Sequence, residues 1–257
     1  MNEQNFPRLE QLHVLRTSAL ASIRDRAFDT LPLSYIDYGD GIVSGCQLKT
    51  NKDSITLQPG IVYFQGFMYF IQEPMRIAYA PADEYRVLKL RFSVPEETEN
   101  FVRRSVMLLM SSNVERQTGE LELCRFKLKA GAVLRTEYVD FFDRLTEFDT
   151  VNDVACLYAS VGGNTISPGI TEAFAREAMN YELDSLDQCF CMEALGGKPV
   201  RREQISYYLL HRLKQKLPSD SNEALFDGLC QVLQMIQSGN TLELLQKRRG
   251  RREVLVD

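Results

Sequence analysis

The residues that decide the fold are 37–71, which read DYGDGIVSGCQLKTNKDSITLQPGIVYFQGFMYFI. This stretch holds five glycines and short apolar runs with almost no charge, a composition typical of short β-strands joined by tight turns. Gln65-Gly66 separates two apolar runs by two residues and predicts a β-hairpin. Pro59-Gly60 predicts a type II turn, because proline fixes its own φ and glycine accepts the positive φ that follows.

Four glycines of this stretch are predicted to be structural: Gly41, Gly45, Gly60 and Gly66. Each stands where the backbone is expected to be left-handed or sterically tight, so that a side chain would hinder it. None of these positions offers a catalytic group. The stretch therefore predicts a part that assembles with others rather than an active centre.

The order of residues resembles small β-modules in tail-fibre and baseplate proteins of tailed phages and of phage-derived contractile injection particles (tailocin-like). The shared pattern is carried by Gly41 to Gly45, Ile55, Leu57, Pro59, Gly60, Ile61 and Gly66, within residues 36–80. The resemblance implies a structural or adaptor subunit of a tail baseplate or fibre, with other tail or baseplate proteins as partners. It also implies a homo-oligomer, a trimer being favoured, which is synthesised in the cytoplasm and assembled in a virion or phage-like particle. The same turns also suit a compact β-domain of any other kind.

Composition favours an ordinary globular protein. The chain has 257 residues, of which 44% are hydrophobic and 25% charged, and it contains no apolar run near the 18 residues of a membrane-spanning helix. The first residues, MNEQNFPRLEQ, show no secretory signal. A net charge of −5 argues against nucleic acid as the main partner. The basic run at 247–252 predicts a docking strip for an acidic neighbour or a solvated end, with phosphate binding as the alternative.

The predicted fold class is α+β: an N-terminal amphipathic helix, an antiparallel β-sandwich or small barrel, and a C-terminal helical bundle. The predicted domains are residues 1–33, 34–146 and 147–257, the last with a basic tail. Apolar residues at three- and four-residue steps predict a helix over 7–31 that ends at Pro32. Its apolar stripe predicts a docking or oligomerisation interface formed by Leu9, Leu12, Leu15 and Ile23.

Within the β region, alternation around Leu88 predicts a strand with Lys89 on its wet face. The apolar run over 105–110 predicts a strand covered on both faces, and a change of face predicts a bulge near Leu123-Cys124. In the last third, Ser167-Pro168 predicts the start of a helix that runs to Gly196-Gly197. Two further helices are predicted, the first closed by Pro218 and the second opened by a capping box, Asp220 with Glu223.

Catalytic, metal and cofactor sites are predicted to be absent. The chain has only two histidines, His13 and His211, and neither lies in a recognisable triad pattern. The six cysteines have no CxxC spacing, which favours reduced and mostly buried thiols over a zinc site. Asp37 and Asp40 could hold a hard cation, but an Asx turn explains the same residues.

Two other functions remain open. A hydrolase of cell-wall or surface polysaccharide would use carboxylates as acid and base, with Asp37, Asp40, Asp140 and Asp143 as candidates. A cytosolic regulatory binding protein would use the C-terminal helices as its contact surface.

Overall fold

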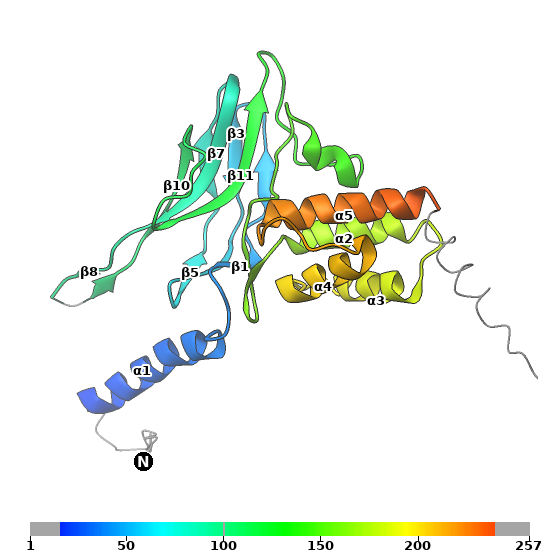
Figure 1. The fold of residues 1–257 in the computed structure, drawn as a ribbon. Coiled ribbons are helices and arrows are strands. Elements are labelled where there is room, and N and C mark those ends of the chain that lie inside the picture. Colours follow the sequence, from blue (N-terminus) through cyan, green and yellow to red (C-terminus); the bar gives the residue numbers. More distant parts are fainter. Residues whose placement is uncertain (1–15, 100, 240–257) are drawn as a thin grey trace, which may run out of the picture.

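The computed structural model describes residues 16–99 and 101–239. A leading helix is followed by β-sheets and then by a bundle of helices (Figure 1), which confirms the α+β prediction. The described elements are α1 Thr17–Ser34, β1 Gly41–Gly45, β2 Leu48–Thr50, β3 Ser54–Leu57, β4 Gly60–Phe64, β5 Phe67–Ile71, β6 Met75–Ala78, β7 Ala82–Phe92, β8 Glu96–Glu97, β9 Val102–Arg103, β10 Val106–Ser111, β11 Glu120–Leu128, η1 Phe141–Leu145, β12 Tyr158–Ser160, β13 Gly163–Thr165, α2 Pro168–Ala178, α3 Ser185–Ala194, α4 Arg202–Leu213 and α5 Asn222–Gln237.

The strands form separate sheets rather than a closed barrel. Five strands are ordered β13-β12-β1-β4-β5, and two three-stranded sheets are ordered β10-β7-β11 and β2-β3-β6. Neighbouring strands pair antiparallel except for β1 and β12, which are parallel. The pairing of β12 with β1 brings residues from the last third of the chain into the first sheet. The 146/147 domain boundary remains a proposal.

The predicted hairpin at Gln65-Gly66 is confirmed, with Phe64 opposite Phe67 across a two-residue turn. Gln65 and Gly66 have φ angles of 48° and 80°, which a primed hairpin turn requires. The type II turn at Pro59-Gly60 is wrong, because Gly60 does not have a positive φ. A Cβ at Gly60 would instead lie 2.4 Å from the Cys46 nitrogen, so this glycine allows β4 to approach the end of β1.

The β core contains a buried ion pair that the strand pattern did not predict. Lys89 is only 1% exposed, and its Nζ lies 3.0 Å from Oε2 of Glu120 and donates to the Glu115 carbonyl at 2.7 Å. The expectation that Lys89 faces water is wrong, because β11 supplies a buried carboxylate beside it. The predicted bulge near Leu123-Cys124 is confirmed by a register shift between Glu122 and Cys124.

The expectation that the strand over 105–110 is covered on both faces is wrong. It forms β10, an edge strand whose residues are half-buried or exposed. An edge strand has a neighbour on one side only, so its apolar side chains keep contact with solvent.

The bundle contains four helices, α2 to α5, around a shared apolar core that includes Phe174, Phe190 and Tyr208. Ser167 caps α2 through Gly169, with Pro168 at the first position, as predicted. The single helix predicted up to Gly196-Gly197 is two helices, because a capping box made by Asp184 and Asp187 starts α3.

The ends of the last two helices also differ from the prediction. Helix α4 ends at Leu213 rather than at Pro218, since Lys214 takes a left-handed backbone with φ 57°. Ser221 rather than Asp220 caps α5, because its side chain accepts a hydrogen bond from the Ala224 nitrogen.

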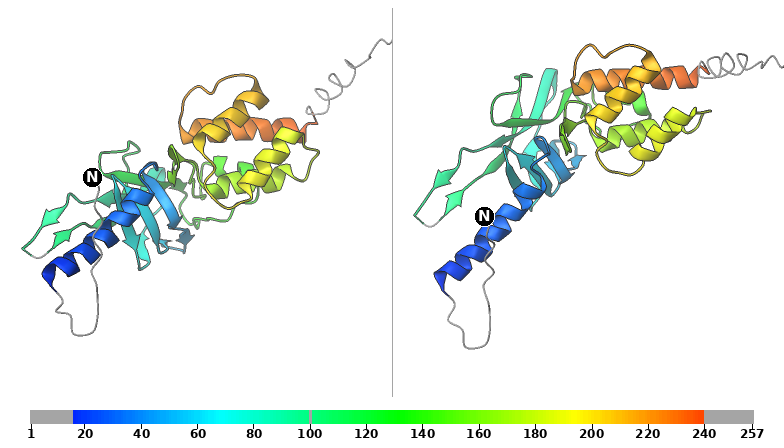
Figure 2. Two further views of the ribbon diagram at one scale, coloured as in Figure 1. Left: turned by 90° about the horizontal axis from the view of Figure 1, so that it is seen from below. Right: turned by 60° about the horizontal axis from the view of Figure 1, so that its bottom comes forward.

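Helix α1 projects away from the sheets, on the side of the molecule opposite the bundle (Figure 2). It runs through Pro32 to Ser34, so the prediction that Pro32 ends it is wrong by two residues. The backbone N–H of Tyr35 bonds the Pro32 carbonyl, so the last turn still closes. A proline near the end of a helix removes one hydrogen bond without preventing that closure.

Candidate functional site

The candidate carboxylates lie in two separate places. Asp40 Oδ1 accepts the Gln65 N–H at 2.7 Å and so braces the β4–β5 turn. Asp143, on η1, accepts from Nη2 of Arg135 at 2.6 Å and from the Val139 N–H at 2.9 Å. The Arg135 guanidinium, more than any other neighbour, holds the pKa of Asp143 well below its ordinary value. Asp143 is therefore a fixed anion and poorly suited to donate a proton.

The other two candidates, Asp37 and Asp140, are exposed residues on different loops. The four carboxylates thus do not flank one cleft, which an acid–base pair acting on a glycosidic bond requires. Within residues 16–99 and 101–239, no group of three or more His, Cys, Asp or Glu side chains is placed to hold a metal ion.

The remaining reactive side chains are also dispersed. His211 is exposed at the end of α4, where its ring lies 4.3 Å from that of Tyr207, and His13 lies outside the described residues. All six cysteines are free, and Cys189 is exposed while the other five are buried. Burial raises the pKa of Cys46 to about 12 and that of Cys191 to about 11, so these thiols are poor nucleophiles at neutral pH.

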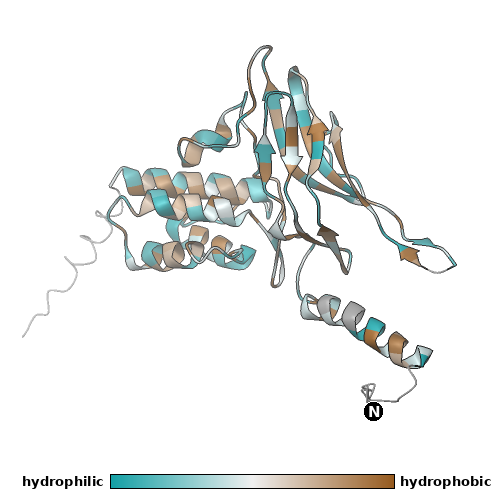
Figure 3. Ribbon diagram, turned by 180° about the vertical axis from the view of Figure 1, so that it is seen from behind, coloured by the Kyte–Doolittle hydropathy of each residue, from teal (hydrophilic) through white to brown (hydrophobic). Residues whose placement is uncertain are grey.

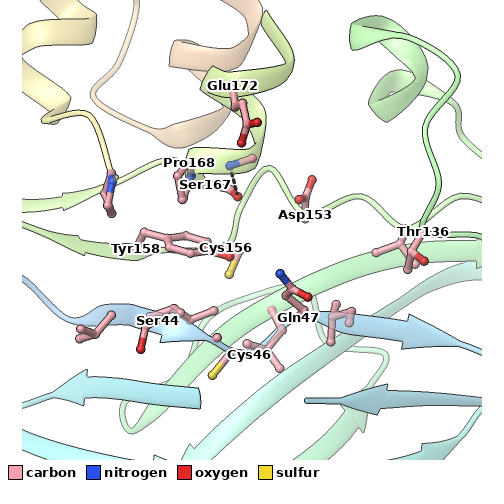
Figure 4. A pocket seen from close by; sticks show the side chains of 18 of the residues that line it. Ser44, Cys46, Gln47, Thr136, Asp153, Cys156, Tyr158, Ser167, Pro168 and Glu172 are labelled. Carbon is pink, nitrogen blue, oxygen red and sulfur yellow. Dashed lines mark hydrogen bonds between the residues drawn. The ribbon is translucent and has the colours of Figure 1, made fainter. Parts of the chain in front are cut away.

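A groove of about 570 Å³ lies where the first sheet meets the bundle (Figure 4). Its walls come from β1, β2, β12, the N-terminal end of α2 and the loop before α4. Asp153 and Glu172 are its two carboxylates, and its lining contains no Lys, Arg or His. We call it the junction groove.

Both carboxylates of the junction groove already have a cationic neighbour. Asp153 Oδ1 accepts from Nε of the buried Arg144 at 3.0 Å, and Glu172 Oε1 accepts from Nη2 of Arg176 at 2.6 Å. The groove lining therefore holds two carboxylates, and each is paired with an arginine whose own side chain is not part of the lining.

A second feature is an apolar surface at the end of the molecule away from the bundle. Three elements contribute to it: α1 and the residues that follow it, the edge strand β5, and the arm formed by β8 and β9 (Figures 1 and 3). Its exposed apolar residues are Leu20, Ile23, Leu33, Ile36, Phe67, Phe70, Val94, Phe101 and Val102. We call this set the end surface.

Helix α1 has little contact with the rest of the described chain. It contacts β5, and the ring of Tyr35, just after the helix, lies 6.2 Å from the ring of Tyr63 on β4. Leu20 and Ile23 remain 51% and 44% exposed. Of the predicted interface residues, Ile23 is thus accessible for contact, while Leu9, Leu12 and Leu15 lie outside the described residues.

Strand β5 and the β8–β9 arm were not predicted as parts of an interface. Strand β5 is the last strand of its sheet and carries Phe70 at 53% exposure. The arm pairs only two residues on each side and carries Phe101 at 75% exposure. Arg104 at its base lies 3.3 Å from the centre of the Phe67 ring and so connects the arm to β5. The sequence signal for β5 was the uncharged run over 67–71, which predicts a strand but not its exposure.

The four glycines predicted to be structural lie around β1, β4 and the β4–β5 turn. A Cβ on Gly41 would lie 2.6 Å from the Ala159 nitrogen, and one on Gly45 would lie 2.3 Å from the Pro59 oxygen. At Gly60 a side chain is hindered by the close approach of β1, and at Gly66 a side chain is disfavoured by the positive φ. Of the four, Gly45 is the one that lines the junction groove.

No protein-family model and no curated protein matches this sequence. Among solved structures, the chain is similar to a crystal structure of TssK over 92% of this chain and 72% of that one, at 10% identity and a TM-score of 0.38. It is also similar to a chain of the type VI secretion system TssK-TssF-TssG baseplate subcomplex, over 90% of this chain and 100% of that one, with the same identity and score. These are coarse likenesses to a baseplate protein, too weak to transfer a fold, a function or partners.

Among the residues that the structure describes, no helix is both long enough and apolar enough to cross a membrane.

Proposed function

We propose that this chain is a structural or adaptor subunit of the tail baseplate or fibre of a phage or phage-derived contractile particle, acting through protein–protein assembly. The β-module in residues 36–80 supports the class of particle. The end surface supports the mode of action, and it is the observation that carries the proposal.

The end surface combines elements that would be stabilised by packing against a partner protein. A helix of 18 residues draws most of its stability in a protein from packing an apolar face, yet α1 keeps Leu20 and Ile23 in solvent. An isolated two-stranded hairpin is marginal in water, yet the β8–β9 arm extends beyond the sheets. Exposed apolar side chains on three elements at one end of a molecule are what a protein–protein contact would cover.

The finer part of the proposal concerns the assembly itself. Copies of this chain associate through the end surface into a homo-oligomer, with a trimer favoured, and that oligomer binds other tail or baseplate proteins. Residues 1–33 serve as the docking segment, residues 34–146 as the β-domain and residues 147–257 as the helical domain. The chain is synthesised in the cytoplasm and assembled in a virion or phage-like particle.

Affinity capture from producing cells, followed by electron microscopy, tests this proposal. The expected result is a sheath, tube or baseplate carrying the tagged chain. The triple variant Ile23→Ser, Phe70→Ser, Phe101→Ser is expected to lose these particles, because it removes one anchor from each element of the end surface. The control is Val133→Ser, Val139→Ser, Met192→Ser, which changes exposed apolar residues elsewhere. Capture of soluble regulatory proteins by the unchanged chain, with no particle, would contradict the proposal.

A further inference from the structure

The junction groove has the shape and charge to accept an extended basic segment. Its lining holds two carboxylates and no cationic side chain. Apolar residues such as Val43, Leu48 and Pro199 line it as well. Lysine and arginine side chains need both features, because their alkyl stems pack on apolar surface while their charged ends meet acids.

This chain contains such a segment close to where the described residues end. Residues 247–252 read KRRGRR, with five cations in six positions. The described chain stops at Gly239, just after α5. The segment therefore starts eight residues beyond the last described position.

The end of α5 lies beside the helix that forms one wall of the groove. Gln237 Nε2 donates to Oε1 of Glu177 at 2.9 Å, which joins the C-terminal ends of α5 and α2. Glu172, in the groove wall, lies five residues earlier on α2, about 8 Å along its axis. Neighbouring helix axes are about 8–10 Å apart. Eight extended residues span about 26 Å, so Lys247 can reach the groove from Gly239.

The acids of the groove are accessible to a new cation. The partner of Glu172 is Arg176, whose side chain is largely exposed, and exposed pairs contribute at most about 1 kcal/mol. A run of five cations can compete for such a carboxylate. Asp153, further along the groove, keeps its contact with the buried Arg144 at 3.0 Å, so Glu172 is the acid open to exchange of partners.

We propose that the basic run at residues 247–252 docks into the junction groove of its own molecule, next to Glu172 and Asp153. This contact is separate from the end surface. The C-terminal segment then lies across the seam between the first sheet and the bundle and links the two.

Zero-length carbodiimide cross-linking of the full chain tests this proposal. The reagent joins a carboxylate and an amine as an amide with loss of water, and Lys247 is the one amine in the basic run. We expect a Lys247–Glu172 product in the peptide mass spectrum. Its yield should fall as NaCl is raised to 1 M, where the screening length is about 3 Å. Glu172→Gln should abolish that product, while Glu193→Gln, at an exposed acid on α3, should leave it unchanged.

Isotope labelling and hydrogen exchange make the test decisive. In a mixture of ¹⁵N-labelled and unlabelled chains, the two linked peptides should carry the same label. Replacing Arg248 and Arg249 by Glu should increase amide exchange in residues 167–172 at least severalfold. Mixed-label products, Lys247 joined only to acids outside the groove, or unchanged exchange would each overturn the proposal. These results do not depend on whether the chain assembles into a particle, so a failure here is distinct from a failure of the proposed function.

Discussion

Gly60→Ala is expected to destabilise the protein by about 3 kcal/mol, the upper end of the usual cost of overpacking. The new Cβ would lie 2.4 Å from the nitrogen of Cys46, 2.5 Å from its Sγ and 2.6 Å from the Ser44 oxygen. Ordinary contacts between such atoms are about 3.5 Å, so β4 and β1 must separate by roughly 1 Å. Two of the three atoms belong to the backbone and cannot move away by a side-chain rotation.

The matched comparison is Gly66→Ala, in the same β-module. Nothing lies within 4 Å of a Cβ at this position, and the cost comes only from its φ of 80°. A left-handed backbone costs a non-glycine residue about 1–2 kcal/mol. Asparagine tolerates that backbone, so Gly66→Asn should recover most of the loss, whereas Gly60→Asn should be at least as harmful as Gly60→Ala.

Urea unfolding at equilibrium, with the free energy taken from midpoint and slope, measures these differences. A packing requirement at position 60 is refuted if Gly60→Ala stays within about 0.5 kcal/mol of the wild type, the range of a harmless surface change. It is also refuted if asparagine stabilises position 60 relative to alanine, since that result would mean that φ rather than space sets the requirement there.

Two further predictions concern buried charge and thiols. Glu120→Gln should cost about 3–5 kcal/mol in urea unfolding, because it leaves the ammonium of Lys89 buried without its carboxylate, and a cost below 1 kcal/mol would count against a buried pair. Burial raises the pKa of Glu120, but hydrogen bonds from Arg91 and Lys89 outweigh this and leave that pKa below its ordinary value. The contribution of Glu120 is therefore present above about pH 4.3 and lost as the pH falls through the lower folded-state pKa, so Glu120→Gln should flatten the acid side of the stability profile. With a thiol reagent at pH 7, one cysteine should react rapidly, and peptide mapping should find it to be Cys189; fast labelling of buried Cys46 would contradict the burial described.

Local signals in the sequence predicted local structure well. Gln65-Gly66 predicts its hairpin because Gly66 accepts the positive φ of a two-residue turn, and the whole requirement lies within four residues. Ser167-Pro168 predicts the start of α2 for the same reason, since cap and first turn are neighbours in the chain. The bulge at Glu122–Cys124 was visible because the apolar period changes within one strand.

Features that depend on distant residues were missed. Lys89 looks like a wet-face residue until Glu120, 31 positions later, is placed beside it. Gly60 looks like a turn glycine until β1 is packed against it. The β12–β13 hairpin consists of two three-residue strands, too short for a periodic signal, and β12 pairs with a strand formed more than a hundred residues earlier.

The candidate interface was predicted in part for a similar reason. An apolar stripe in residues 7–31 is visible in one helix, which is how Ile23 was found. Phe70 and Phe101 are apolar residues in short strands, where a buried and an exposed aromatic look alike. The structure separates the exposed from the buried aromatic residues in two ways. The sheet order leaves β5 at an edge, and the arm extends beyond the sheets.

Hydrogen–deuterium exchange on the isolated chain and on the chain within its captured assembly tests the central claim most directly. Contact through the end surface predicts slower exchange on assembly in α1, β5 and residues 94–103. It predicts unchanged exchange on the outer faces of α3 and α4, where Met192 and Tyr207 are also exposed. Protection confined to those helices, with α1, β5 and the arm exchanging as in the free chain, would contradict it.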